Sequence, residues 1–404
     1  MNKLSSIAYY VTDKISSNDI SLSEYVTTDC ILQNKKGREV ASNLPPQPCC
    51  LTRYQRGDIL IANIRPYLKK VWFADIDGGA SSDVLVFRVK EGHSPSFLYA
   101  VLLQDSFFDY VMQGAKGSKM PRGDKEQILR YEMPTLSCSE ESIGTFFLNL
   151  DQKIRLNEQI NQNLEAMAKQ LYDYWFVQFD FPNEEGKPYK SSGGEMLWNE
   201  KLKRKIPVGW HCGNLFEIAV FTNGLACQKF RPKDNEVPLP VIKIREMHDG
   251  ISVDTEKVTS NIPESVKVYN GDVLFSWSAS LEVMLWAYGL GGLNQHIFKV
   301  TSANDFPKSF YYFQLLDYVD VFKKMAEARK TTMGHITQDH LQQSTIAIPD
   351  NKDIADKFEE LISPIFRQII KLQEEISNLT KQRDELLPLL MNGQVSVNSD
   401  LADD

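Results

Sequence analysis

Two short loops of this chain combine cations with hydroxyl groups and glycine. Lys116–Arg122 reads Lys-Gly-Ser-Lys-Met-Pro-Arg, and Arg329–His335 reads Arg-Lys-Thr-Thr-Met-Gly-His. Lysine and arginine neutralise phosphates, hydroxyls and backbone N–H groups fix register on them, and arginine also reads guanine bidentately. An ordinary solvated loop is the alternative, but the cationic character recurs in both places. We therefore predict that both loops contact DNA.

Two further basic clusters, at residues 35–38 and 229–233, are candidates of the same kind, since the second interleaves its cations with Phe230 and Pro232. Residues 65–70 follow a strand that begins with Gly-Asp, and Ser276 and Ser278 occupy the corresponding place later in the chain. Solvated charge is again the alternative for each. The candidate DNA contacts are Lys35, Lys36, Arg38, Arg65, Lys69, Lys116, Ser118, Lys119, Arg122, Lys229, Arg231, Lys233, Arg329, Lys330, Thr331 and Thr332.

Sequence motifs of catalysis are missing. The chain has no G-x-x-x-x-G-K-[ST] loop and no N-P-P-[FYW] or D-P-P-[FYW] string. His335 and His340 are one residue too far apart for H-E-x-x-H and lack its glutamate. The six histidines show no metal-ligand spacing with the cysteines. We expect a non-catalytic chain that binds no metal, ATP or S-adenosylmethionine by itself.

The six cysteines form no C-x-x-C pair, and Cys49 and Cys50 are adjacent, which suits a disulfide poorly. We interpret them as reduced thiols and expect a cytoplasmic protein. The first ten residues lack a charged region followed by an apolar run, so a signal peptide is not expected. No apolar stretch approaches the length of a membrane span.

The elements that must position these loops occur twice. Gly57-Asp58-Ile59-Leu60 returns as Gly271-Asp272-Val273-Leu274, and Ser96–Tyr99 returns as Ser309–Tyr312. The offset stays between 213 and 215 residues, as it does from Pro134 to Pro349. A fixed offset through half of a chain indicates tandem copies of one unit.

Each copy is predicted to contain short strands with one or two helices, followed by a long amphipathic helix. In the first copy we expect strands at 58–62, 84–89 and 128–133 and a helix at 97–112. In the second we expect strands at 272–276, 296–300 and 345–348 and a helix at 309–325.

The first long helix is predicted to begin after Pro134, capped by Ser137 or Ser139, and to end near residues 175–179. Its apolar face carries Asn157 and Asn161, which either set the register against a partner helix or face solvent. Trp175 and Phe176 are expected in a core rather than at a ligand site.

The second long helix is predicted to follow Pro349, with Asp350 as its N-cap. Nine of ten heptad positions from Phe358 to Leu390 are apolar, which is coiled-coil periodicity. Pro364 lies inside this run, so the helix either kinks there or restarts. Neither long helix can bury its apolar stripe alone, which favours antiparallel packing of one on the other. An ordinary α+β protein with long core helices is the alternative.

The net charge is −8, but its distribution matters more than its sum. Acidic residues concentrate on the two long helices and the C-terminal tail, whereas the globular regions are nearly neutral. Local basic surfaces on those regions are therefore compatible with DNA binding. The acidic helix faces are either solvated or meet a protein partner; their residues are Glu158, Glu165, Glu374, Glu375, Asp384 and Glu385.

Three strings in this order, with the duplication, resemble the specificity subunits of type I restriction–modification systems over nearly the whole chain. They are Leu171–Asp180, Ile206–Trp210 and Arg383–Gly393, which read LYDYWFVQFD, IPVGW and RDELLPLLMNG. The resemblance implies two target recognition domains that read the halves of an asymmetric, interrupted DNA site. It also implies long helices that set the spacing and bind two methyltransferase subunits, and possibly restriction subunits. S-adenosylmethionine and ATP would be bound by these partners.

The resulting fold class is α+β, a tandem duplication of a mixed α/β recognition domain followed by a long helix, with the two helices as an antiparallel coiled coil. A protein-interaction scaffold with two binding heads and a nuclease with an unrecognised carboxylate cluster are the rival functions. The expected organisation is recognition domain 1 at 1–137, spacer helix 1 at 138–180, a linker at 181–204, recognition domain 2 at 205–349, spacer helix 2 at 350–395 and a disordered acidic tail at 396–404.

Overall fold

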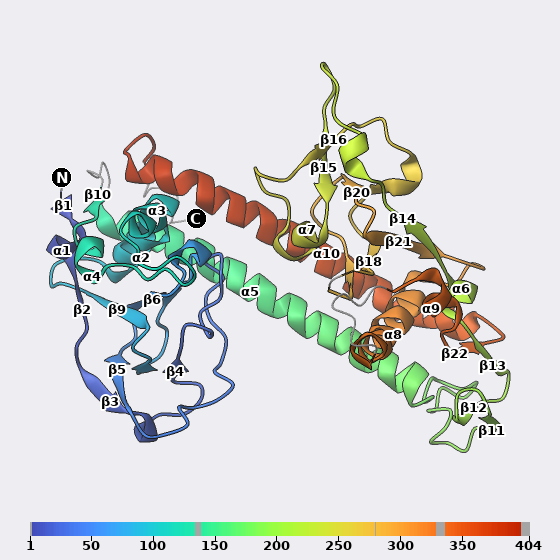
Figure 1. Cartoon of the computed structure of the whole chain (residues 1–404). Helices are drawn as coiled ribbons and strands as arrows, with labels where there is room; N and C mark the ends of the chain where they lie inside the picture. Colours follow the sequence, from blue (N-terminus) through green and yellow to red (C-terminus); the bar gives the residue numbers. More distant parts are fainter. Residues whose placement is uncertain (1, 134–138, 279, 329–335, 397–404) are drawn as a thin grey trace, which may run out of the picture. The chain divides into compact units, whose positions relative to one another are not determined.

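The computed structural model of the chain describes residues 2–133, 139–278, 280–328 and 336–396 (Figure 1). The chain forms two compact units: unit 1 holds residues 1–156 and 378–404, and unit 2 holds residues 157–377. Both units are mixed α/β and both include segments of the two long helices, which confirms the predicted fold class.

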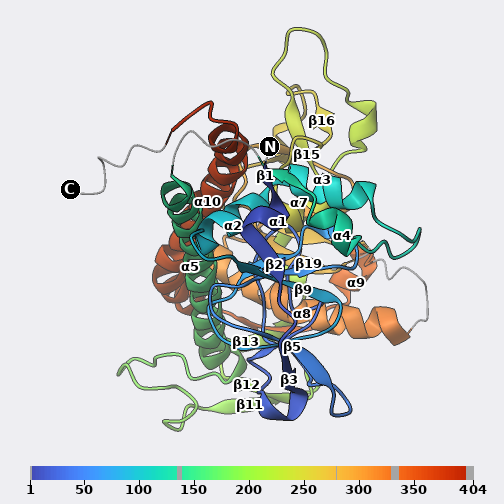
Figure 2. The same cartoon turned by 90° about the vertical axis from the view of Figure 1, so that its left-hand side faces the viewer.

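Unit 1 contains two four-stranded sheets, in the orders β2-β9-β6-β7 and β3-β5-β8-β4. Helix α2 packs on β6, β7 and β9 of the first sheet; α2 and β9 are labelled in Figure 2. The elements are β1 (Asn2–Lys3), α1 (Leu4–Ile7), β2 (Ala8–Tyr10), β3 (Lys14–Ser16), η1 (Ser17–Asp19), β4 (Tyr25–Val26), β5 (Cys50–Tyr54), β6 (Ile59–Ala62), η2 (Pro66–Leu68), β7 (Val71–Phe73), β8 (Gly78–Ala80), β9 (Val84–Val89), α2 (Pro95–Leu103), α3 (Asp105–Gln113), α4 (Lys125–Ile128), β10 (Glu132–Met133) and the first part of α5 (Glu140–Tyr172).

The first sheet of unit 2, in the order β14-β21-β18-β19, repeats the topology of the first sheet of unit 1, whereas its second sheet has the order β16-β15-β20-β17, with the outer strand β16 added at the opposite side from β3. In both units the second sheet contains one parallel pair, β4 with β8 and β15 with β20. Its elements are η3 (Asp173–Val177), β11 (Met196–Asn199), β12 (Arg204–Pro207), β13 (Trp210–Gly213), α6 (Leu215–Ile218), β14 (Ala219–Asn223), η4 (Cys227–Lys229), β15 (Leu239–Ile242), α7 (Ile244–Asp249), β16 (Lys257–Val258), η5 (Glu264–Val266), β17 (Lys267–Val268), β18 (Val273–Ser276), β19 (Glu282–Leu285), β20 (Gly291–Leu293), β21 (Ile297–Ser302), α8 (Lys308–Ala328), α9 (Gln338–Gln342), β22 (Ile346–Pro349) and most of α10 (Asp353–Met391).

The repeated Gly-Asp strings form the same turn in both units. Gly57 and Gly271 have φ angles of +90° and +87°, the left-handed region that favours glycine. The Asp58 carboxylate accepts a hydrogen bond from the Gln55 N–H at 2.9 Å, and the Asp272 carboxylate accepts one from the Tyr269 N–H at 2.8 Å. Turn geometry therefore explains why these strings survived the divergence of the two copies.

The long helices repeat their buried faces with an offset of 215 residues. Apart from Gly144, whose counterpart Glu359 is half-buried, each buried residue on α5 and η3 has a buried counterpart on α10, including the polar ones. The pairs are Ile143 and Phe358, Phe147 and Ile362, Asp151 and Phe366, Ile154 and Ile369, Asn157 and Leu372, Asn161 and Ile376, Ala168 and Arg383, Tyr172 and Leu387, Trp175 and Leu390, and Phe176 and Met391. One heptad frame thus fits both helices.

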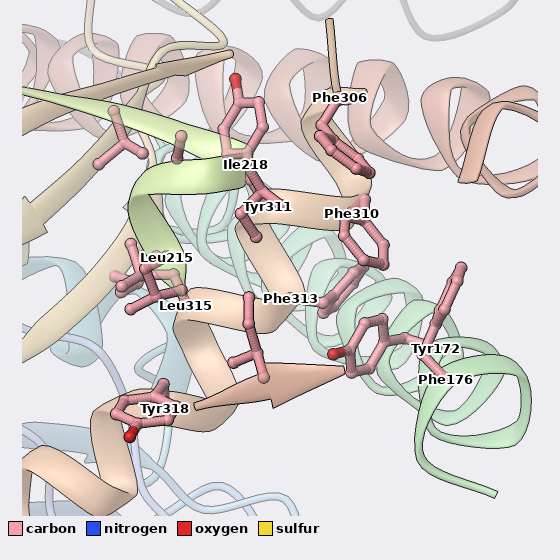
Figure 3. Packing of buried hydrophobic residues seen from close by; sticks show 14 of the residues in the cluster. Tyr172, Phe176, Leu215, Ile218, Phe306, Phe310, Tyr311, Phe313, Leu315 and Tyr318 are labelled. Atoms are coloured by element: carbon pink, nitrogen blue, oxygen red, sulfur yellow. The ribbon is translucent and has the colours of Figure 1, made fainter. Parts of the chain in front are cut away.

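Within each unit the two helices run antiparallel. In unit 2, Tyr172 and Trp175 contact the ring of Phe358, so the end of α5 meets the beginning of α10. Figure 3 shows Tyr172 and Phe176 directed toward Phe310 and Phe313 of α8, in the core that Trp175 and Phe176 were predicted to join. In unit 1, Ile143 and Phe147 share a core with Leu387 and Leu390, so the beginning of α5 meets the end of α10.

Several predicted boundaries are wrong. The helix expected at 97–112 is two helices, α2 and α3, separated at Gln104, whose backbone is extended. The strand expected at 128–133 is reduced to β10, because α4 occupies the preceding residues. α10 neither restarts nor breaks at Pro364, which lies inside the continuous helix. Residues 196–199 and 204–207, at the end of the expected linker, pair as an antiparallel hairpin.

The predicted helix caps are partly right. Ser137 lies outside the described residues, but the Ser139 hydroxyl accepts a hydrogen bond from the Ser142 N–H at 3.1 Å, as its alternative role requires. Asp350 does not cap α10; the side chain of Asn351 accepts from the Asp353 N–H at 3.1 Å instead. The Asp350 carboxylate meets His211 Nδ1 at 2.5 Å.

We expect the contact of His211 with Asp350 to make the stability of unit 2 depend on pH. Burial lowers the pKa of His211, but the carboxylates of Asp350 and Glu217 outweigh it and hold the pKa above its ordinary value. A group whose pKa is higher in the folded state than in the unfolded state stabilises the fold. This stabilisation is complete at pH values below the pKa of the unfolded state and is lost as the pH rises through the pKa of the folded state. We expect His211→Gln to lower the melting temperature at pH 6 more than at pH 8.5 in thermal denaturation. An equal loss at both pH values would contradict this.

Asn157 and Asn161 are buried on the helix face, which rules out the solvent-facing alternative. Within the described part of the chain, neither amide atom of Asn157 has a hydrogen-bond partner, and Asn161 Oδ1 also lacks one. Their counterparts on α10 are Leu372 and Ile376. Since an unpaired buried amide costs desolvation energy, we expect Asn157→Leu to raise the free energy of unfolding by about 1–2 kcal/mol in urea titration. Asn163→Leu, at an exposed position on the same helix, should change it by less than about 0.5 kcal/mol.

Candidate DNA-contacting loops

The loop at residues 116–122 is a closed, exposed turn in unit 1. The backbones of Lys116 and Arg122 exchange two hydrogen bonds of 2.9 Å, and Gly117 at the turn has a φ angle of +98°. The side chains of Lys116 and Arg122 are 84% and 58% exposed, and Ser118 and Lys119 are exposed as well. The loop therefore presents its cations outward, as a phosphate contact requires.

The loop that carries Arg65 lies against this turn. The Arg65 N–H donates to the Pro121 carbonyl at 2.8 Å, and Ile64 forms a β-bridge with Arg122. The side chain of Arg65 is exposed. Candidates more than fifty residues apart in sequence thus stand on one surface.

A third loop joins the same surface. The Asn34 N–H donates to the Leu68 carbonyl at 2.9 Å, and the Lys35 N–H donates to the Lys69 carbonyl at 3.0 Å. Lys36 is exposed and projects from this loop. We name residues 34–38, 63–70 and 116–123 together the loop cluster.

The backbone of the loop cluster is held in an unusual conformation. Four of its non-glycine residues have positive φ angles between +51° and +62°, which is a small share of backbone space for such residues. Residues in such conformations must be held in place by the surrounding structure, and they occur preferentially at functional sites. The four residues are Asn34, Lys35, Arg65 and Lys69.

Two predicted contacts in this cluster have intramolecular partners instead. Lys35 is 5% exposed, and its ammonium lies 2.8 Å from Asp105 and 3.3 Å from Asp384, so a direct DNA contact for it is wrong. Arg38 is half-buried, with its guanidinium 4.4 Å from the ring centre of Trp72 and a 2.9 Å hydrogen bond to the Ser23 carbonyl. Both cations hold the loop in place.

Three cations of the cluster have acidic neighbours that the sequence pattern did not reveal. Lys116 pairs with Asp124 at 3.1 Å, Arg122 with Asp83 at 3.2 Å, and the half-buried Lys69 with Asp105 at 2.9 Å. The pairs of Lys116 and Arg122 are exposed and contribute little stability, so a phosphate can displace their carboxylates. Backbone N–H groups, chiefly of Gln127, and the Lys116 ammonium hold the pKa of Asp124 below its ordinary value. No local pattern links these acids to the loops, because they come from other elements.

Unit 2 carries its own basic loop after η4. Lys229, Arg231 and Lys233 are all exposed, whereas Phe230 packs against the core and its carbonyl accepts from the Thr259 N–H at 2.9 Å. The aromatic residue therefore anchors the loop, and the cations point outward. Arg329, Lys330, Thr331 and Thr332 lie outside the described residues.

Ser276 and Ser278 do not belong to an exposed surface. Ser276 is fully buried and its hydroxyl donates to the Ser278 carbonyl at 3.3 Å, while Ser278 itself is 7% exposed. Contact of these side chains with DNA is therefore wrong. Within residues 2–133, 139–278, 280–328 and 336–396, no three His, Cys, Asp or Glu side chains are grouped to hold a metal ion.

Comparison with known proteins gives matches over nearly the whole chain. Residues 207–381 match the model of the type I restriction modification DNA specificity domain. The type I restriction enzyme MjaIX specificity subunit of Methanocaldococcus jannaschii is 23% identical over 396 residues, covering 95% of this chain and 86% of that protein. The HindI specificity subunit of Haemophilus influenzae is 23% identical over 441 residues, covering 92% and 94%.

The fold is also found among solved structures. The crystal structure of a type I restriction–modification S subunit from M. genitalium superposes with a TM-score of 0.57 and 13% identity, covering 96% of this chain and 95% of that one. The resemblance drawn from the three sequence strings is confirmed by these matches.

Proposed function

Because this chain belongs to the type I restriction–modification specificity subunits, we propose that its two copies read the two halves of an asymmetric, interrupted DNA site. The chain itself recognises DNA, and other subunits carry out catalysis. The observation that carries the proposal is the convergence of separate basic segments into the exposed loop cluster of unit 1. Unit 2 offers a different basic loop on a related pair of sheets, which suits a second, unlike half-site.

The exposed residues of these loops are the proposed DNA contacts. Phosphate contacts fix the position of a domain on the duplex, and arginines can add base readout in the major groove. In unit 1 the proposed contacts are Lys36, Arg65, Lys116, Ser118, Lys119 and Arg122, with the half-buried Lys69 beside them, and in unit 2 they are Lys229, Arg231 and Lys233.

The partners follow from the same family. DNA and methyltransferase subunits are the partners of the chain. We infer that the chain binds two methyltransferase subunits and that restriction subunits can join this assembly. S-adenosylmethionine and ATP would be held by those partners rather than by this chain. None of the helices in the described ranges is long and apolar enough to span a membrane. We infer a cytoplasmic site of action, where the DNA is.

The long helices are the proposed spacer, and their length can be tested separately from recognition. A separation of about one helical turn, roughly 34–36 Å, lets two recognition domains approach the same side of a duplex. Four residues inserted near Asn157 add about 6 Å of helix at 1.5 Å per residue. We expect modified-base sequencing to show both half-sites unchanged and a longer gap between them. Altered bases in either half-site would reject the spacer role.

A further inference from the structure

Resting on the proposed function, we propose that Lys35 is a positioning residue: it fixes the DNA-facing loop cluster of unit 1 to the C-terminal part of α10 through Asp384 and to α3 through Asp105.

The ammonium of Lys35 is shared between two carboxylates from distant parts of the chain. Asp105 begins α3, and Asp384 lies in the last two turns of α10, at 2.8 and 3.3 Å from Lys35 Nζ. Lys69, on the neighbouring loop, also pairs with Asp105 at 2.9 Å. Partial burial raises the pKa of Asp105, but Lys35 and Lys69 outweigh it and lower that pKa below its ordinary value. The carboxylate thus stays charged and holds both loops.

Asp384 is linked through Arg383 to the other long helix, α5. Arg383 is 4% exposed and its Nε lies 3.1 Å from the Asp384 carboxylate, while its Nη1 lies 3.3 Å from the buried Asp151 of α5. The loop also passes close to α5, since a Cβ added to Gly37 would lie 3.4 Å from Cδ of Arg155. Lys35 therefore connects the loop to a network of ion pairs between α10 and α5 rather than to an isolated side chain.

Backbone hydrogen bonds connect the loop that holds Lys35 to the two loops that carry the other proposed contacts. Its backbone donates to the carbonyls of Leu68 and Lys69, and the Arg65 N–H on that second loop donates to the Pro121 carbonyl beside Arg122. A change at Lys35 thus reaches exposed cations on both other loops through backbone hydrogen bonds. Lys35 itself, at 5% exposure, cannot reach a phosphate.

Adjacent lysines give a matched pair for the test. Each phosphate contact contributes about 0.9 to the slope of log affinity against log salt concentration. We expect Lys36→Met to reduce this slope by about 0.9, since Lys36 is exposed, and Lys35→Met to leave it unchanged. The measurement uses the chain assembled with its methyltransferase subunits and a duplex that carries the methylated motif of the host.

The second readout is sequence discrimination. We expect Lys35→Met to reduce the preference for the target over a duplex altered in the half-site of unit 1 by about tenfold, the low end of what a lost base contact costs. The preference for the target over a duplex altered in the other half-site should remain, and this result would show that the variant is folded. Asp384→Asn should cause a smaller loss of the same kind, and Lys35→Arg should restore most of it.

A reduced salt slope for Lys35→Met, or unchanged discrimination at both half-sites, would overturn the positioning role while leaving the proposed function intact. If the unsubstituted complex showed neither steep salt dependence nor sequence preference, the proposed function would fail, and this inference with it.

Discussion

Replacing Lys116, Lys119 and Arg122 together by alanine should weaken DNA binding by roughly 100- to 1,000-fold at 0.1 M salt, if each contacts a phosphate. The reason is counterion release: each phosphate that loses its cation keeps its condensed counterions, which lowers the slope of log affinity against log salt by about 0.9. These side chains are exposed on one closed turn, so their loss should leave the fold of unit 1 unchanged. Fluorescence anisotropy at several salt concentrations measures both quantities.

The control removes the same charge elsewhere. Lys187, Lys190 and Lys203 are exposed cations of unit 2, outside the proposed DNA-contacting loops. Their combined replacement by alanine should change affinity and salt slope far less. Equal losses for the two triple variants would mean that only net charge matters, and the loop cluster would not be a DNA-contacting surface.

Arg383→Met should destabilise unit 1 strongly, by about 3 kcal/mol. Arg383 and Asp151 are 4% and 2% exposed, and removal of the cation leaves a buried carboxylate with less compensation. Asp151 keeps Arg155 at 3.0 Å and the Tyr99 hydroxyl, which donates to it at 2.8 Å, so the loss should stay at the low end of the range for broken buried pairs. Hydrogen exchange resolved by peptide separates unit 1 from unit 2.

Two controls define the cause of this loss. Arg367→Met, at an exposed position of the same helix, should change stability by less than about 0.5 kcal/mol. The double variant Arg383→Met/Asp151→Leu should cost less than the sum of its single changes, because the repeat places the apolar pair Ala168 and Phe366 at the corresponding positions of unit 2. Strict additivity would show that the pair is not coupled.

The sequence allowed the repeat, a few of the strands and the two long helices to be predicted, because each rests on a local pattern. The strand at 84–89 and the heptad run from Phe358 are examples. The break between α2 and α3 was missed since helical spacing continues across Gln104. A restart at Pro364 was a wrong alternative: proline disfavours helix interiors, yet α10 continues through it and the heptad stripe on both sides stays buried.

The candidate site was less predictable, for a physical reason. Charge and exposure are separate properties, and only the fold decides whether a lysine meets solvent or a carboxylate. Lys35 and Lys36 are neighbours in sequence, yet one is buried in an ion pair and the other is exposed. The convergence of loops at Arg65 and Arg122 depends on backbone hydrogen bonds between distant segments, which no local pattern reports.

The most direct test of the central claim is modified-base sequencing of the host genome with the gene for this chain intact, deleted, and restored with the loop substitutions Arg65→Ala and Arg122→Ala. We expect one interrupted, asymmetric methylated motif to vanish on deletion, to return with the intact gene, and to be lost or relaxed in one half only with the substituted gene. An unchanged set of methylated motifs after deletion, in cells that express the methyltransferase partner, would contradict the assignment of DNA sequence recognition to this chain.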